Sequence, residues 1–569
     1  MANFYTDHPE IQFNVESSPL MEKIVALKEH DFADKDNFDY APENFADAMD
    51  SYNRVCEIAG EITANTIFPN SEAVDAEGPH CENGRVRYAS KTYENLEATR
   101  KAGLNGVTMP RRYGGLNFPV TVYTAINEMI ASADAGFENI WSLQDCIETL
   151  YEFGNDDQRS RYIPRVCAGE TMSMDLTEPD AGSDLQRVML KATYSEEDKC
   201  WYLNGVKRFI TNGDSDIHLV LARSEEGTHD ARGLSMFIYD KRDGGVTVRR
   251  IENKMGIHGS PTCELVYKNA KAELCGSRKR GLIKYVMALM NGARLGIAAQ
   301  SVGISQTSYD EALAYAKDRK QFGTEIVNFP AVYEMLSTMK AKLDAGRALL
   351  YETARYVDIY KGLEDMERER PLTPEEKQEL KKFDKLATAL TPLAKGMNAE
   401  FANQNSYDCI QVHGGSGYML EYASQRLYRD ARITSIYEGT TQLQTVAALP
   451  HLSTGEYSAI IAELEAQPVA PEFETLAARA KAMSVKFNEV LEAVKTTGDK
   501  ELLDLACRHL YELAAYCIMT QLLLRDATKN AAMFGKSLKV FVNYAEAEVA
   551  KHYNFVKSLD ASQIANYKA

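Results

Sequence analysis

The chain has 569 residues, of which 45% are hydrophobic and 26% charged, which is the composition of an ordinary globular protein with several domains. Its formal net charge of −18 argues against nucleic acid as a bulk partner, because phosphate binding needs a basic surface. The first residues show no basic segment followed by an apolar run, and no apolar stretch approaches the roughly 20 residues that span a bilayer. We therefore expect no leader peptide, no membrane span and a cytoplasmic location.

The periodicity of apolar residues predicts four folded parts after an irregular, acidic extension over residues 1–45. Residues 46–171 have helical spacing, with one helix expected from about Val120 to Ala133, another from Phe137 to Phe153 and a further helix start at Asp157. Residues 172–280 contain short apolar runs punctuated by Gly, Asn and Asp, which predict a small β-barrel or sandwich. Helical patterns return over 281–452 and, after a proline-containing linker, over 453–569. The predicted fold class is therefore α+β and mainly α, with an additional helical domain at the C-terminus.

Ten cysteines are present, and none belongs to a C-x-x-C pair. Most of them stand in apolar helical or strand contexts. Metal ligation is therefore not expected, and buried, reduced thiols are the better interpretation.

Glu438 stands between Tyr437 and the segment Gly439-Thr440-Thr441, where the chain can turn and present backbone N–H groups. If this turn is buried, an apolar environment raises the pKa of the carboxyl group toward neutrality, as a general base requires. For this short segment alone, an ordinary surface turn is the favoured interpretation. Whether Glu438 is a catalytic base therefore depends on the other motifs of the chain.

Two segments near the start of the β region are suited to a ligand that has hydrogen-bonding groups along one edge. Leu176–Asp184 is a turn rich in hydroxyl and backbone donors. Lys207–Gly213 reads as a strand that enters a turn, with Phe209 and Thr211 expected on one face. The alternatives are a plain Pro/Gly turn and an ordinary hairpin.

Two further segments lie in the helical region. Met290 and Arg294 share a helix face, although a solvated arginine is the alternative. Arg319–Gly323 and Gln411–Gly417 contain glycines that permit close backbone approach to a phosphate or an adenine. His413 is expected to pack beside the glycine turn rather than to act in catalysis. We find no G-x-G-x-x-G motif after a strand, so a dinucleotide would not be bound by a Rossmann fold.

Taken together and in this order, these motifs resemble those of the acyl-CoA dehydrogenase family over about residues 50–450. The resemblance implies a helical domain, a central β-barrel or sandwich and a four-helix bundle. The segment Lys254–Glu264 and the C-terminal extension resemble the longer subgroup that includes the 3-methylmercaptopropionyl-CoA dehydrogenases.

The resemblance also implies a role for each motif residue. FAD contacts are implied for Leu176, Thr177, Ser183, Phe209, Thr211, Arg319, Phe322, Gln411, Gly414, Gly415, Thr440 and Gln442. Arg319 and Phe322 would reach the FAD of a neighbouring subunit. Contacts to acyl-CoA are implied for Ser183, Asn291, Arg294, Tyr437 and Gly439. No metal is implied.

The implied reaction is the α,β-dehydrogenation of an acyl-CoA to the trans-2-enoyl-CoA, as in fatty acid β-oxidation, with electrons passed to an electron-transferring flavoprotein. Glu438 would take the α-proton. A minority of the family carries its acid immediately before the position of Arg294, where this chain has Ala293, so Glu438 is the one candidate. The alternatives are an acyl-CoA oxidase that uses O₂, a non-catalytic binding paralogue and a purely structural helical protein.

Two expectations remain about the substrate and the assembly. Trp141, Leu143 and Ile147 are candidates for lining the acyl pocket, although Trp141 is equally compatible with the core. Flavin sites built from two subunits imply a homo-oligomer. The helical extension at 472–565 would cover a surface that shorter relatives use to form tetramers, which favours a homodimer.

Overall fold

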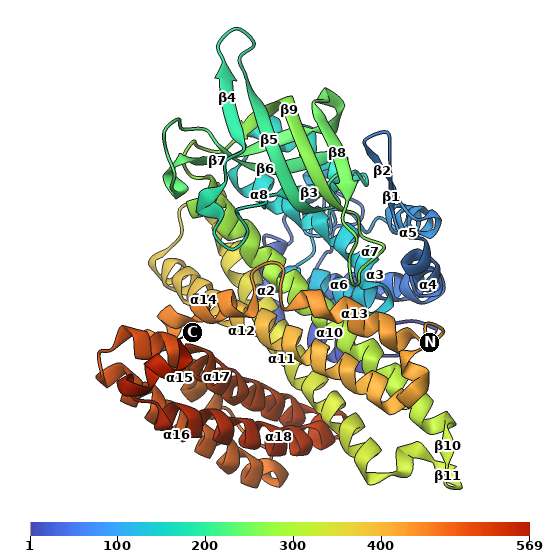
Figure 1. The fold of residues 1–569 in the computed structure, drawn as a ribbon, viewed down its shortest axis with the longest axis vertical. Helices are drawn as coiled ribbons and strands as arrows, with labels where there is room; N and C mark the ends of the chain where they lie inside the picture. Colours follow the sequence, from blue (N-terminus) through green and yellow to red (C-terminus); the bar gives the residue numbers. More distant parts are fainter. Residues whose placement is uncertain (1, 569) are drawn as a thin grey trace. The chain divides into compact units, whose positions relative to one another are not determined.

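The computed structural model describes residues 2–568 (Figure 1). The chain divides into two compact units, the first ending at Gly296 and the second beginning at Ile297. Each unit has its own core, and each carries a part of the predicted site.

The first unit begins with nine helices. They are α1 (Pro9–Glu16), α2 (Leu20–Lys28), α3 (Phe45–Ile62), α4 (Phe68–Glu77), α5 (Ser90–Lys101), α6 (Val120–Ala133), α7 (Ala135–Trp141), α8 (Cys146–Phe153) and α9 (Asp156–Cys167). The expectation of an irregular extension over residues 1–45 is wrong, because α1 and α2 form there. They bury Ile11, Val15 and Ile24, so these short helices are stabilised by packing rather than by intrinsic propensity.

Other local predictions for this region are confirmed with small changes. The helix predicted from Val120 to Ala133 has those bounds. The helix predicted over 137–153 is interrupted by a 3₁₀ turn at Ser142–Asp145. Asn155 caps α9 through a reciprocal capping box with Gln158, which places the helix start one residue before the predicted Asp157.

A short hairpin was missed by the sequence analysis. Strands β1 (His80–Glu82) and β2 (Arg85–Arg87) pair antiparallel across Asn83-Gly84. Both turn residues have positive φ angles, of 52° and 73°. An Asn-Gly pair of this kind is a strong hairpin signal, because both residues tolerate the left-handed backbone that a tight turn requires.

A seven-stranded barrel follows. Its strands are β3 (Met172–Asp175), β4 (Lys191–Ser195), β5 (Cys200–Thr211), β6 (Ile217–Arg223), β7 (Leu234–Asp240), β8 (Val246–Ile251) and β9 (Thr262–Cys275). Pairing runs from β6 through β4, β5, β9 and β7 and back to β6, so the sheet closes on itself. Trp201, Phe237 and Tyr267 fill a core among these strands. The β prediction is therefore confirmed, with the barrel as the form adopted.

The helices of the second unit form two groups. The bundle consists of α10 (Met287–Asp318, which begins in the first unit), α11 (Pro330–Glu369), α12 (Pro374–His413), α13 (Ala423–Thr434) and α14 (Thr441–Ser453). The extension consists of α15 (Glu456–Glu465), α16 (Glu474–Thr496), α17 (Lys500–Lys529) and α18 (Ala531–Ser558). A two-residue hairpin, β10 (Lys320–Gln321) and β11 (Thr324–Glu325), joins α10 to α11.

The extension packs directly onto the bundle, with α17 and α18 against α11 and with α17 against α14 (Figure 1). Buried polar contacts cross this interface. Arg525 of α17 donates to the carboxylate of Glu352 of α11 at 2.8 Å, and Ser537 of α18 donates to Asp344 of α11 at 2.5 Å. The extension therefore shares a core with the bundle that carries Glu438.

Among the described residues, one helix, Gly281–Asp318, has the length and apolar composition to cross a membrane. This is weak support for membrane insertion, because the core helix of a bundle has the same properties. Gln300, Ser301 and Gln306 of this helix are buried, which is the pattern of a helix packed among other helices.

Candidate active site

Glu438 lies in the turn that joins α13 to α14. Its side chain is half-buried. Its φ angle is +53°, in the left-handed region, and Gly439 follows at +86°. For a residue with a β-carbon, the left-handed region costs roughly 1–2 kcal/mol and persists where surrounding contacts over-determine it. The turn therefore holds its one carboxylate in a conformation that the local sequence does not favour.

Contacts from three helices fix this turn. Lys395 of α12 donates to the Gly439 carbonyl oxygen at 2.7 Å. The Gln444 side-chain amide of α14 donates to the same oxygen at 3.0 Å and to the Glu438 carbonyl at 3.2 Å. The Tyr437 hydroxyl donates to the Gln300 side chain of α10. The chain is therefore held from outside the turn through the Tyr437 side chain and through the carbonyl groups of Glu438 and Gly439.

The start of α14 lies beside an open cavity of about 610 Å³. Thr440 caps the helix by accepting a hydrogen bond from the Leu443 N–H group at 3.3 Å. Thr441 donates to Glu400 of α12 at 2.7 Å. Thr440 and Gln442 both line the cavity, so the two residues predicted to touch FAD after Glu438 border one space. A helix N-terminus in such a place favours anionic groups.

The end of α10, just before the Arg319–Gly323 motif, lies beside the Gln411–Gly417 motif at the end of α12. Tyr315 of α10 stacks on the ring of His413, with ring centroids 4.3 Å apart, and its hydroxyl donates to Ser416 at 3.2 Å. His413 is buried and hydrogen-bonded to the Cys409 carbonyl, and burial lowers its pKa. His413 thus packs beside the glycine turn, as expected.

Every residue predicted to contact FAD from this end of the bundle is exposed: Arg319, Phe322, Gln411, Gly414 and Gly415. The Phe322 side chain is 97% exposed. A β-carbon placed on Gly414 or Gly415 would meet no atom within 4 Å, so the glycine turn faces open space.

The barrel unit brings together the other predicted flavin contacts. The Arg208 N–H group donates to the Thr177 carbonyl at 2.9 Å, so the loop after β3 lies beside β5. The β5–β9 register shifts between Lys207 and Ile210, and Phe209 lies in this bulge with φ at +61°. The bulge interrupts the simple strand alternation from which a common face for Phe209 and Thr211 was predicted.

The Phe209 ring is 51% exposed. An exposed aromatic ring beside hydroxyl and backbone donors suits a flat ring with a polar edge, such as a flavin. Leu176 is buried, Thr177 is half-buried and Ser183 is exposed.

The predicted substrate contacts on α10 are half-buried, and Arg294 donates to Asn291 at 3.3 Å. The candidates for the acyl pocket lie in the interior of the first unit. Trp141 is buried, donates to the Leu104 carbonyl at 2.9 Å and stacks on Tyr123. Leu143 and Ile147 belong to a core cluster. These contacts give Trp141 a role in the core.

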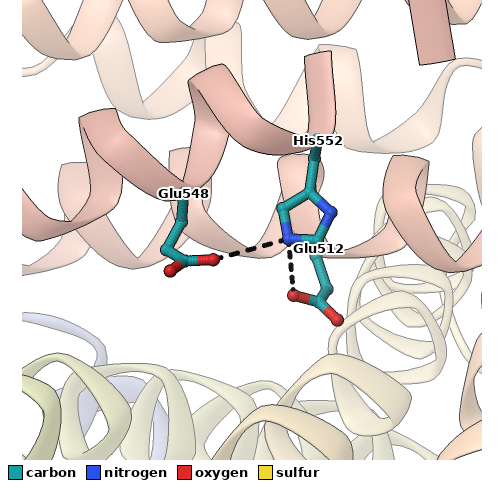
Figure 2. A group of neighbouring side chains, drawn as sticks. All are labelled: Glu512, Glu548 and His552. Carbon is teal, nitrogen blue, oxygen red and sulfur yellow. Dashed lines mark ion pairs between the residues drawn. The ribbon is translucent and has the colours of Figure 1, made fainter. Parts of the chain in front are cut away.

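Among the described residues, one group has the spacing of a metal site: Glu512, Glu548 and His552, on α17 and α18 (Figure 2). His552 Nε2 lies 2.9 Å from a Glu512 oxygen and 3.7 Å from a Glu548 oxygen. Arg508 pairs with Glu512 and Lys551 pairs with Glu548. Because Arg508 and Lys551 already balance the two carboxylates, a divalent ion would add two uncompensated positive charges, and we interpret the cluster as an ion-pair network between two helices.

The chain has a helical region, a barrel and a helical bundle, in this order. A carboxylate is held at a turn of the bundle, and an aromatic ring is exposed on the barrel. These features suit an enzyme that carries out flavin-dependent oxidation. Sequence models of acyl-CoA dehydrogenase domains match nearly the whole chain: the N-terminal domain over 56–170, the middle domain over 173–270, the C-terminal domain over 280–448, and a further C-terminal model over 453–564. The chain belongs to the acyl-CoA dehydrogenase family and is a flavin-dependent oxidoreductase with FAD as its cofactor.

Individual relatives agree with this assignment. The chain is 34% identical to the 3-methylmercaptopropionyl-CoA dehydrogenase of Ruegeria pomeroyi, over 70% of this chain and 69% of that protein. It is also 34% identical to a 3-(aryl)acrylate reductase of Clostridium sporogenes, over 71% of this chain and 98% of that protein.

Two solved structures illustrate the fold. A chain from the structure described as the electron transferring flavoprotein of Acidaminococcus fermentans is 29% identical, with a TM-score of 0.61 over 70% of this chain and 97% of its own length. The FAD complex of a Bacillus anthracis acyl-CoA dehydrogenase shares the fold including the extension, at 23% identity and a TM-score of 0.75, over 91% of this chain and 90% of that one.

Sequence reasoning missed the residues that support the site. Lys395 is 43 residues before Glu438 in the sequence, and Gln300 lies still further away. Lys207 is fully buried and donates to the Leu176 carbonyl at 2.8 Å and to Glu178 at 2.9 Å. A single charged residue inside an apolar stretch, such as Leu393-Ala-Lys-Gly-Met397, was the one available signal.

Proposed function

We propose that this enzyme oxidises an acyl-CoA thioester to the trans-2-enoyl-CoA, with Glu438 as the base that removes the α-proton. The observation that carries the proposal is the turn at Glu438, which presents a carboxylate on a left-handed backbone held by Lys395 and Gln444. A positioned general base contributes roughly 10²–10⁴-fold to a proton transfer. Holding the carbonyl groups of Glu438 and Gly439 in place is what such positioning requires.

The other parts of the proposed site have separate tasks. Leu176, Thr177, Phe209 and Thr211 would hold the flavin ring from the barrel, and Thr440 and Gln442 would contact FAD after the base. Bound FAD supplies the hydride acceptor, so the protein has to supply position, electrostatics and the exclusion of water. Hydrogen bonds to the thioester carbonyl, including one from the Glu438 N–H group, would make the α C–H bond more acidic. Ser183, Asn291, Arg294, Tyr437 and Gly439 would contact the acyl-CoA.

We propose an electron-transferring flavoprotein as the electron acceptor, and a homodimer in the cytoplasm as the working form. The exposure of Arg319 and Phe322 supports a homo-oligomer, because residues that reach a neighbouring subunit's FAD must lie on the surface of an isolated chain. The helical extension over 472–565 favours a dimer over a tetramer, because it would cover a surface that shorter relatives use to form tetramers. In light scattering a mass of two chains supports the dimer, and a mass of four chains contradicts it.

The experiment that tests this function is an anaerobic titration of the FAD-loaded protein with acyl-CoAs, from butyryl-CoA to palmitoyl-CoA and including 3-methylmercaptopropionyl-CoA. We expect the flavin absorbance to bleach with at least one of them, and the enoyl-CoA to appear in equal amount. Failure of every acyl-CoA favours a non-catalytic binding paralogue, and a purified protein that binds no flavin favours a structural role.

Two related activities, those of an oxidase and of a reductase, can be tested with the same protein preparation. Rapid hydrogen peroxide production in air, without an electron-transferring flavoprotein, favours an acyl-CoA oxidase. Because one relative is a reductase, the reverse direction is tested by mixing the reduced enzyme with the enoyl-CoA. Reoxidation that is much faster than reduction by the acyl-CoA would favour a reductase.

A further inference from the structure

Lys395 is a charged side chain buried inside the bundle. It lies in the middle of α12, among apolar neighbours on the same helix, and its side chain has no exposed surface. An ammonium group removed from water costs several kcal/mol unless polar partners replace the lost hydration. One partner is the Gly439 carbonyl oxygen at 2.7 Å, on the residue directly after Glu438.

The hydrogen bond from Lys395 is made to the part of the turn whose backbone φ angles are least favourable. Glu438 and Gly439 have consecutive left-handed φ angles of +53° and +86°. Lys395 and Gln444 together donate to the carbonyl groups of both residues, and the Thr441 N–H group donates to the Ser435 carbonyl at 3.0 Å to close the turn. The Lys395 bond is charge-assisted and therefore the stronger contact at Gly439.

The extension packs close to Lys395 on α12. A β-carbon on Gly396 would lie 2.0 Å from the hydroxyl oxygen of Tyr511 of α17, so these two helices pack at a distance that only glycine allows. That hydroxyl donates to the Pro392 carbonyl at 2.9 Å. The extension therefore helps to exclude water from the part of α12 that carries Lys395.

We propose that Lys395 is a positioning residue for the base, which sets the orientation of the Glu438 turn without itself touching the substrate. The proposal rests on the proposed function for its effect on catalysis. Its structural part, the control of the turn, is independent of any substrate. Without the Lys395 bond, the Glu438–Gly439 backbone relaxes toward more favourable φ angles and the carboxylate moves away from its working position.

The test compares Lys395→Met and Lys395→Gln with Tyr457→Phe in the FAD-loaded, full-length protein. Tyr457 is a matched control, because its buried hydroxyl also donates to a backbone carbonyl of α12, that of Ala389 at 2.8 Å, far from the turn in sequence. The glutamine variant keeps a donor and is the alternative if the methionine variant does not fold. Urea unfolding reports the general loss of stability in each variant.

The first measurement is amide hydrogen exchange of residues 435–441 without substrate. We expect exchange at Thr441 to accelerate about tenfold or more in Lys395→Met, less in Lys395→Gln and not in Tyr457→Phe. Unchanged protection in both lysine variants overturns the proposal. So does equal acceleration in Tyr457→Phe. This outcome does not depend on whether the protein turns over any acyl-CoA.

The second measurement is stopped-flow flavin reduction by the acyl-CoA that bleaches the wild-type enzyme best. We expect the limiting rate constant to fall roughly a hundredfold in Lys395→Met while the acyl-CoA concentration at half-maximal rate changes little, because a misplaced base slows chemistry more than binding. A weaker acyl-CoA affinity with an unchanged limiting rate overturns the role of Lys395. If no acyl-CoA reduces the wild-type flavin, the proposed function fails, and the exchange measurement still decides the structural proposal.

Discussion

The Nζ atom of Lys207 lies 2.8 Å from the carbonyl oxygen of Leu176 and fixes the loop that follows β3 against β5. The same ammonium pairs with Glu178, whose carboxylate accepts the Met189 and Leu190 N–H groups at 2.7 and 2.9 Å. One buried lysine thus holds the proposed flavin loop in the barrel unit, as Lys395 holds the base turn in the bundle.

The first prediction concerns this loop. Lys207→Met alone is expected to lower the free energy of unfolding by about 3–5 kcal/mol, because it leaves the Glu178 carboxylate buried without its cation. The double variant Lys207→Met/Glu178→Gln should recover part of that stability but bind FAD at least about tenfold more weakly. Urea unfolding and flavin fluorescence measure the two quantities. If the double variant binds FAD as tightly as the wild type, the loop does not depend on Lys207.

The second prediction concerns Phe322. Its side chain is almost fully exposed in the single chain, so Phe322→Ala should change the free energy of unfolding by no more than about 0.5 kcal/mol. A residue that contacts a neighbouring subunit's FAD should nevertheless weaken FAD binding when it is removed, by roughly tenfold. Tyr333→Ala, on another exposed aromatic of the bundle, is the control. An unchanged FAD affinity in Phe322→Ala would argue against a cross-subunit site.

The third prediction concerns the attachment of the extension. Arg525→Met should lower the free energy of unfolding by about 3–5 kcal/mol, because it removes a cation from the buried Glu352 carboxylate. Arg525→Met/Glu352→Leu should regain only part of this loss, because the buried Asp526 still lacks its Arg525 partner and the buried Arg355 loses its pair with Glu352. Denaturant unfolding of the four proteins of this cycle measures the coupling. A double variant no more stable than Arg525→Met would contradict this account of the interface.

The fourth prediction concerns pH and the network of Figure 2. Burial acts to raise the pKa of Glu512, but the hydrogen bond from His552 and the Arg508 guanidinium outweigh it and lower that pKa to about 2. A carboxyl whose pKa is depressed in the folded state stabilises the protein above its unfolded pKa of about 4.5 and loses this contribution as the pH falls toward 2. Glu512→Gln should therefore be less stable than the wild type at pH 7, with a difference that shrinks below pH 4.5.

The pKa values of the two histidines of this network should be shifted in opposite directions. His509 Nδ1 lies 2.8 Å from His552 Nδ1, so one ring donates and the other accepts. Burial and the neighbouring imidazole lower the pKa of His509 to about 4, whereas the hydrogen bonds to Glu512 and Glu548 raise the pKa of His552 despite its burial. We expect ring resonances in NMR to show His552 titrating at a higher pH than a free imidazole and His509 at a lower one. A His552 that titrates at a lower pH than His509 would contradict this assignment.

The sequence was sufficient for the fold class and for most long elements, because their apolar periodicity is strong. Helix α6 has the predicted bounds, and the barrel strands fall where short apolar runs alternate with turn residues. Helices α1 and α2 were missed because they are only 8 and 9 residues long and depend on tertiary packing. The bulge at Phe209 could not be predicted, because pairing with β9 determines it.

The motif residues of the proposed site could be named from the sequence, but the residues that support them could not. Glu438 is the predicted base because of the family resemblance, since its turn alone favours an ordinary surface turn. Its left-handed backbone and the Lys395 bond depend on how α12 packs against α13 and α14, which no local pattern encodes. Sequence motifs therefore indicate candidate ligand-contacting groups more readily than the buried groups that hold those candidates in place.

The most direct test of the central claim is stopped-flow flavin reduction in Glu438→Gln, which keeps the size and the hydrogen-bonding groups of the side chain but removes the base. The account predicts that this variant binds FAD as the wild type does, with flavin reduction by the best acyl-CoA slowed by roughly three or more orders of magnitude. Reduction at a rate near that of the wild type would contradict the assignment of Glu438 as the base.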